Sequence, residues 1–364
     1  MVYPVLLPHL RVTFNLDLAA AGLLLSLLFV AYALGQLPGG VLADRIGERI
    51  TLTVSVGLSA GALLLLVATD SRVALFVGTA VLGLAVGLYA IGRFTAVARI
   101  YPDGYGTAVG VLNVAPALGQ GVIPPIAGVI AAVAGWKAGF GFLIPVFVLV
   151  AGTLWVVVPT HDPTTRSAVD SLSFETLGYL LGVLRTPAIV LATLLMIVGI
   201  SIWQAFTGFY PTYLIEEKGL SSSIASLLFG VYFGATAIVH LLSGIIYDRT
   251  DVRYSVSLVV VAVGALLALP FVENVWLLGI LSVLLGTILA FETSTESYLV
   301  AILPADVEGT GFGVLRTTVF ATGAVSPLLF GAVAEEGFFD EVFFILAGLA
   351  TLVILIGTRL PVAE

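Results

Sequence analysis

Two carboxylates stand in an apolar stretch of this 364-residue chain. In the segment LAFETSTESYLV, residues 289–300, Glu292 and Glu296 are four residues apart. Residues at this spacing share one face of a helix. A carboxylate that is removed from water and has a like-charged neighbour tends to take up a proton, and it can also neutralise an arginine. The segment therefore predicts a proton carrier, an ion pair, or one of each.

Two arginines in other apolar stretches could complete such a site. Arg93 and Arg316 each stand where a charged side chain costs roughly 2.5–3.5 kcal/mol on insertion scales. A guanidinium offers a fork of donors that fits a carboxylate. Arg93 could therefore bind an organic anion, with Glu296 as its counter-ion when the site is empty. Alternatively, Arg316 forms a structural salt bridge with Glu292 or Glu296 on a neighbouring helix.

The segment SIWQAFTGFY, residues 201–210, adds aromatic and amide groups. Trp203 and Gln204 could line a pocket for a small organic solute. Helix packing and an aromatic belt at the membrane interface explain the same segment equally well. We expect His240 to satisfy a hydrogen bond between helices, and a proton relay through it is the less favoured alternative.

The chain that carries these residues is unusually apolar. Hydrophobic residues make up 60% of it, charged residues only 10%, and the mean hydropathy is +1.16. Soluble domains carry about 45–50% apolar and about 25% charged residues. A bilayer core about 30 Å thick needs roughly 20 helical residues to cross it, and only helices or closed barrels satisfy their backbone there. The long continuous runs predict an all-α membrane protein rather than the short alternating strands of a barrel.

We expect twelve crossings, the first of them short. Their approximate bounds are 1–11, 19–42, 50–69, 72–100, 106–133, 139–158, 187–211, 222–246, 254–271, 275–302, 309–333 and 341–358. Lys and Arg mark the cytoplasmic side of such proteins. With the loop at 43–49 in the cytoplasm, eight cations lie inside and four outside: Arg45, Arg49, Arg99, Arg166, Arg185, Arg249, Arg253 and Arg359 against Arg11, Arg72, Lys137 and Lys218. We therefore expect a multi-pass plasma-membrane protein with both termini cytoplasmic.

Composition and motifs exclude several classes of function. The chain has no cysteine, and its three histidines are scattered, so we expect no metal and no cofactor. The net charge of −8 argues against nucleic acid as a partner. No Walker motif is present, so the chain itself does not use ATP. Without a nucleophile–base pattern, we do not expect an enzyme.

The chain repeats itself at a spacing of about 203 residues. GGVLADRIGER, residues 39–49, matches SGIIYDRTDVR, residues 243–253. GTAVGVLN, residues 106–113, matches GTGFGVLR, residues 309–316, in nearly the same register. The repeat predicts two six-helix bundles at 1–158 and 187–364, joined by a cytoplasmic linker at 159–186. Both halves have the same orientation, which is typical of secondary transporters with a site near the membrane midplane.

The repeat also places the charged residues relative to one another. Glu296 falls opposite Arg93, and Glu292 falls opposite Tyr89. We therefore expect Glu292 to carry the proton and Glu296 to pair with arginine.

The first helix breaks the repeat. Pro8 aligns with Pro211, so Met1 aligns near Gln204, well inside the seventh crossing. We therefore expect the first helix to be truncated and the natural chain to start upstream of Met1.

The segment GGVLADRIGER resembles the motif Gly-x-Leu-Ala-Asp-Arg-x-Gly-x-Arg of the major facilitator superfamily. The matching residues are Gly40, Leu42, Ala43, Asp44, Arg45, Gly47 and Arg49, and the degenerate second copy keeps Asp248, Arg249 and Arg253. The resemblance implies two helix bundles that rock about a central cavity lined by helices 1, 4, 7 and 10.

The resemblance also implies a gating role for the motif. Asp44 would bond the N-terminus of helix 11, near Gly309, and latch the cytoplasmic side shut. Arg45 and Arg49 would tie the loop to the bundle or to lipid phosphate. The alternative is a positively charged turn with no gating role. Drug–proton antiporters of the family carry a Gly-Pro pair in helix 5, which the segment GVLNVAPALGQGVIPPIAG lacks.

These features predict a monomeric secondary transporter that moves a small organic solute by alternating access, coupled to protons. A uniporter, a sodium-coupled porter and a non-transporting membrane sensor on the same fold are the alternatives. The substrate, the direction of transport and the coupling ion stay open.

Overall fold

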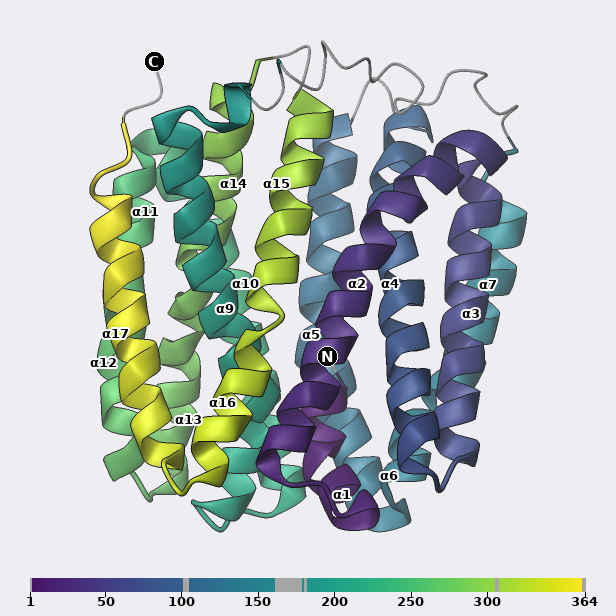
Figure 1. Cartoon of the computed structure of the whole chain (residues 1–364), viewed down its shortest axis with the longest axis vertical. Helices are drawn as coiled ribbons and strands as arrows, with labels where there is room; N and C mark the ends of the chain where they lie inside the picture. The colour runs from purple at the N-terminus through teal and green to yellow at the C-terminus, as the bar shows by residue number, and fades with distance from the viewer. Residues whose placement is uncertain (1, 101–104, 161–178, 180–181, 305–307, 362–364) are drawn as a thin grey trace.

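The computed structural model describes residues 2–100, 105–160, 179, 182–304 and 308–361, and the elements within these ranges are helices with no strand. Side chains are described for these residues except at 44, 94, 95, 98, 99, 105–114, 117 and 308–310. The long helices run side by side along one direction and form two groups, one from each half of the sequence (Figure 1).

The first half contains α1 to α7. The helices are α1 (Tyr3–Phe14), α2 (Leu18–Ile46), α3 (Glu48–Ala68), α4 (Arg72–Ile100), α5 (Tyr105–Ala134), α6 (Trp136–Gly141) and α7 (Leu143–Val157). The short α6 and the longer α7 together make one crossing.

The second half is more interrupted. It contains α9 (Pro187–Glu216), α10 (Ser222–Arg249), α11 (Val252–Ser257), α12 (Val259–Ala268), η3 (Leu269–Phe271), α13 (Val275–Leu285), η4 (Gly286–Leu289), α14 (Ala290–Ile302), α15 (Glu308–Gly323), α16 (Ser326–Glu335) and α17 (Phe339–Gly357). The pieces α11 to η3, α13 to α14, and α15 with α16 each make one crossing. The 3-10 turn η4 interrupts the tenth crossing directly before its two glutamates.

Ten helical stretches in the described residues are long and apolar enough to span a membrane. The remaining two predicted crossings correspond to α1, which has 12 residues, and to α5, whose apolar part is Leu118–Ala134. The described helices therefore agree with the twelve predicted crossings.

The two halves meet through pseudo-symmetric contacts. Gly128 of α5 lies against Ser226 of α10, and Gly331 of α16 lies against the backbone of Leu18 in α2. Gly128 and Gly331 are equivalent in the sequence repeat, and each packs on the second helix of the other half. Small residues allow such close approach of helices within a bilayer.

Hydrogen bonds join the halves at one end of the bundle. We call the end of the bundle at which α2 ends and α3 begins the motif face, and the other end the opposite face (Figure 1). At the opposite face, Arg11 of α1 pairs with Glu216 of α9. The N–H of Leu18 donates to Glu335 at 2.5 Å, and the N–H of Leu328 donates to Ser26 at 3.0 Å. These contacts close the opposite face between the halves.

Within the first half, α2 and α4 pack closely at Gly87. A Cβ on Gly87 would collide with the backbone carbonyl of Tyr32 and with Gly35. We expect Gly87→Val to force the two helices apart and to cost about 1–3 kcal/mol, the range for overpacked cores. Thermal unfolding of the purified protein in detergent measures the loss. Gly57→Val is the matched control, because a Cβ on Gly57 meets nothing within 4 Å. Equal unfolding midpoints for both variants would contradict the packing.

Candidate functional site

The ion pair between Glu296 and Arg316 lies among the membrane-spanning helices. α14 presents Glu296 to α15, and one guanidinium nitrogen of Arg316 lies 2.5 Å from Glu296 Oε1. The two side chains keep 27% and 23% of their surface exposed, so the pair is not sealed into packing. The guanidinium also lies 5.2 Å above the ring of Phe320, one helical turn further along α15. Of the two arrangements predicted for Glu296, the structure has the pair with Arg316.

Arg93 approaches this pair from the other half. Its charge acts on both Glu296 and Arg316, and the ring of Tyr32 lies close to both arginines. Tyr32 also packs edge-on against Phe320, with ring centroids 5.7 Å apart. Glu296 is held by Arg316 because α14 and α15 belong to the same bundle, whereas Arg93 must reach it across the interface. Arg316 thus contacts this carboxylate directly, whereas Arg93 acts on it electrostatically from the other half.

Glu292 lies one helical turn from Glu296 and has a different neighbour. His240 of α10 places its Nε2 3.6 Å from Glu292 Oε2 and its Nδ1 2.8 Å from Thr293 Oγ1. The bond to Thr293 is the contact between helices that the sequence predicts for His240. The approach to Glu292 is additional, and the residue numbers alone give no signal for it. The two glutamates therefore differ in their direct contacts, although the charge of Arg316 acts on both and His240 also acts on Glu296.

Trp203 and Gln204 lie deeper, towards the opposite face. Gln204 is fully buried on α9 beside Gly323, seven residues or about 10 Å along α15 from Arg316. Its amide atoms and the indole nitrogen of Trp203 have no hydrogen-bond partner among the described residues. The ring of Trp203 lies 6.2 Å from that of Phe29 in the other half. Trp203 and Gln204 thus lie nearer the opposite face than Glu296 and Arg316 do.

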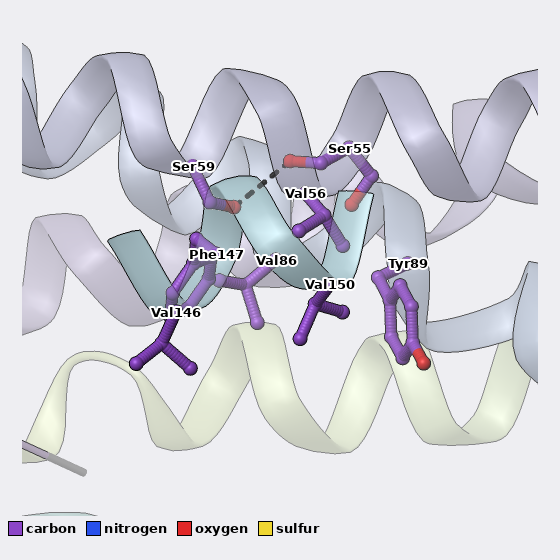
Figure 2. A pocket seen from close by; sticks show the side chains of 8 residues that line it. All are labelled: Ser55, Val56, Ser59, Val86, Tyr89, Val146, Phe147 and Val150. Atoms are coloured by element: carbon purple, nitrogen blue, oxygen red, sulfur yellow. Dashed lines mark hydrogen bonds between the residues drawn. The ribbon is translucent and has the colours of Figure 1, made fainter. Parts of the chain in front are cut away.

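A separate cavity of about 270 Å³ lies within the first half, between α3, α4 and α7 (Figure 2). Its walls are Ser55, Val56, Ser59, Val86, Tyr89, Val146, Phe147 and Val150. The hydroxyl of Ser55 donates to the Ala85 carbonyl, and that of Ser59 donates to the Ser55 carbonyl. The serine hydroxyls are thus engaged with backbone, and the remaining walls are largely apolar. An organic anion would find no charged partner there.

The structure describes most of the side chains of the loop motif at residues 39–49. Gly47 turns the chain between α2 and α3 with φ of +86°, a conformation that favours glycine. Arg49 lies 4.4 Å above the ring of Trp155 on α7. Its repeat equivalent, Arg253, donates two bonds to the Leu360 carbonyl just beyond α17. Each arginine thus ties the third helix of its half to the sixth.

The remaining motif residues lie at the same face. Gly40 of α2 packs against Ile91 of α4, and Arg45, Asp248 and Arg249 are exposed at the ends of α2 and α10. The side chains of Asp44 and of residues 308–310 lie outside the described part of the chain, so the predicted latch stays a prediction.

The profile of the Major Facilitator Superfamily matches residues 1–254. The chain belongs to the major facilitator superfamily. It is therefore a multi-pass membrane protein of a transporter family whose members bind small-molecule substrates, as the sequence predicts.

Relatives of the chain carry transporter names. A probable sulfoacetate transporter, SauU, of Cupriavidus necator is 27% identical over 93% of this chain and 84% of its own length. A hexuronate transporter of Bacillus subtilis is 25% identical over 61% of this chain and 54% of its own length. A multidrug resistance protein, MdtG, of Citrobacter koseri is 25% identical over 90% of this chain and 81% of its own length.

Solved structures share the fold. The nucleoside transporter NupG, crystallised as a point mutant, superposes with a TM-score of 0.80 at 15% identity. The match covers 98% of this chain and 94% of that one. At this identity the likeness shows the major facilitator fold and leaves the substrate open.

We predict that removing one member of the ion pair costs more stability than removing the other. Glu296→Gln leaves Arg316 charged, because a guanidinium does not lose its proton in proteins, whereas Arg316→Gln leaves a carboxylate that can take one up. We expect Glu296→Gln to cost about 1–3 kcal/mol of stability, less than a fully buried pair because part of it is exposed. Arg316→Gln should cost less.

Thermal unfolding in detergent measures both losses. The double variant should be more stable than Glu296→Gln alone, since no unpaired charge remains. A double variant that loses the sum of the two single losses would show that the residues are not coupled.

Proposed function

We propose that this major facilitator carries a small organic anion across the plasma membrane by alternating access, coupled to protons. The observation that supports it is the ion pair of Arg316 with Glu296, with Arg93 of the other half near enough to act electrostatically on both. Two guanidiniums offer paired donors for a carboxylate or sulfonate group. A site that draws one arginine from each half can sense the relative position of the halves.

The names of two relatives support an anionic substrate. Sulfoacetate and hexuronate are organic acids, and proteins named for their transport match 93% and 61% of this chain. A cationic drug would meet two arginines at the same place. The anion therefore fits the charges of the site better than the substrate class suggested by the multidrug relative.

Binding would proceed by exchange of partners. The anionic group of the substrate replaces Glu296 on Arg316 and takes a second donor from Arg93, which draws the two halves together. Trp203 and Gln204 then meet the other end of the substrate, where the amide and indole provide donors and an acceptor. Glu292, one turn from Glu296, forms part of the site for the proton that accompanies the anion.

The closed opposite face supports an inward-facing arrangement, with the motif face in the cytoplasm as the distribution of Lys and Arg favours. The halves 1–158 and 187–364 would rock as units about the site, with 159–186 as a cytoplasmic linker and both termini in the cytoplasm. In the outward-facing state, Asp44 would cap the N-terminus of α15 and close the motif face. Glu335 already caps α2 in the equivalent way at the opposite face.

Uptake into proteoliposomes tests this function. With the lumen made alkaline, we expect accumulation of radiolabelled sulfoacetate or glucuronate and no uptake of the cation ethidium. Glu292→Gln should abolish the effect of the pH gradient. Arg93→Lys should weaken the apparent affinity by about tenfold, because lysine lacks the planar fork. Uptake of ethidium but of neither anion would refute the proposal.

Glu335→Gln tests the closure of the opposite face. Glutamine keeps an acceptor for the N–H of Leu18 but loses the charge that the helix N-terminus favours, an effect of about 0.3–1 kcal/mol. We expect the opposite face to open up to about fivefold more often. The chain has no native cysteine, so labelling of a single Ala21→Cys by an impermeant maleimide reports the opening. Glu336→Gln is the control. Equal labelling rates for both variants would contradict a role for Glu335 in closing the opposite face.

A further inference from the structure

His240 is engaged at both of its ring nitrogens by consecutive residues of α14. Its Nδ1 lies 2.8 Å from Thr293 Oγ1, and its Nε2 lies 3.6 Å from Glu292 Oε2. The side chains of His240 and Glu292 are 30% and 18% exposed, so they are not sealed into packing while the protein still fixes their positions. An imidazole between a hydroxyl and a carboxylate is arranged for proton binding.

This arrangement can take up a proton without losing a hydrogen bond. In the unloaded state, the hydroxyl of Thr293 donates to Nδ1 and the Nε2–H faces the carboxylate of Glu292. After loading, both ring nitrogens carry hydrogen, Nδ1 donates to Thr293, and Nε2 still faces Glu292. Only the hydroxyl of Thr293 rotates, from donor to acceptor. We call His240 and Glu292 together the couple. The net charge of the couple changes from −1 to 0.

Glu296 cannot load a proton as easily. It is bonded to Arg316, which stays charged, so protonation must first break the ion pair. The couple of His240 and Glu292 can load while that pair is intact. The two glutamates therefore suit different tasks, although they are only one turn apart.

The charged and titratable groups around the couple come from several helices. Tyr232 of α10 and Arg316 of α15 interact with Glu292. Glu296, on the same helix as Glu292, acts on His240. Arg93 of α4 acts on Glu296. Further along α14, Tyr298 is acted on by Asp251, which precedes α11, and by Arg253 within it. Tyr210 of α9 acts on Tyr232. Loading puts a positive charge on His240, so the net charge of His240 and Glu292 beside Glu296 changes from −1 to 0.

The sequence repeat places different chemistry at the equivalent positions of the first half. Gln36 corresponds to His240, and Tyr89 corresponds to Glu292. Glutamine does not titrate, and tyrosine ordinarily keeps its proton near neutral pH. The histidine–carboxylate couple is therefore a feature of the second half alone.

We propose that His240 and Glu292 together form the proton-loading site, with Thr293 as the residue that orients the imidazole. This inference rests on the proposed proton-coupled transport and assigns its coupling residues. Loading at this couple neutralises the charge of Glu292 beside the site, which favours binding of the incoming anion.

Infrared difference titration of the purified protein between about pH 5 and 8 tests the couple without any substrate. We expect imidazole and carboxylate bands that change together in the wild type and that both disappear in His240→Gln. His240→Asn, which keeps a polar group near Thr293, should lose them as well. His9→Gln is the matched control and should keep the paired change. Independent titration of the two bands, or their persistence in His240→Gln, would overturn the assignment.

Transport measurements separate coupling from structure. With glucuronate and sulfoacetate as probes, His240→Gln should lower accumulation driven by a pH gradient at least about tenfold, and leave counterflow at equal pH within about twofold. Thr293→Val should shift the pH dependence of uptake, and Thr293→Ser should restore it. Equal loss of both activities in His240→Gln would mean a structural role. Wild-type counterflow without any response to pH would refute proton coupling, and this inference with it, but not transport.

Discussion

The ion pair between Glu296 and Arg316 holds two full charges among membrane-spanning helices, where lipid supplies neither water nor counter-ions. α15 can carry Arg316 at this depth because α14 presents a carboxylate to it. Arg93 adds a third charge from the other half. The helices α4, α14 and α15 must therefore keep their register, because a slip of one turn would leave a charge unpaired.

The packing between the halves is compatible with movement about such a cluster. Gly128 against Ser226 and Gly331 against Leu18 bring backbones together through small residues. These contacts carry little side-chain interlocking, so they can separate at modest cost. The hydrogen bonds that accompany them at the opposite face involve few partners, among them Glu335 and the N–H of Leu18. Within each half, Arg49 and Arg253 hold the third helix to the sixth, which favours movement of each half as a unit.

Much of the fold could be predicted because hydropathy and the repeat are properties of long segments. The crossings, the two bundles and the equivalence of Arg49 with Arg253 follow from such patterns. The arrangement of the site was harder to predict from the sequence, because it depends on how each helix is rotated about its axis. Whether Glu296 meets Arg93 or Arg316, and whether His240 reaches Glu292, changes with a rotation that hydropathy cannot resolve. The turn η4, which sets the direction of α14, has no strong signal in the segment GTIL.

The two halves differ at the repeat-equivalent positions that matter most for the proposed function. A duplicated bundle begins with the same chemistry at both copies of each position. Here the first half has Gln36, Tyr89 and Arg93, where the second half has His240, Glu292 and Glu296. The first half thus contributes a fixed positive charge, whereas the second contributes groups that can change protonation or partner. An anion and a proton can then be bound by adjacent but distinct sets of residues, and the repulsion between Glu292 and Glu296 links the occupancy of one to the other.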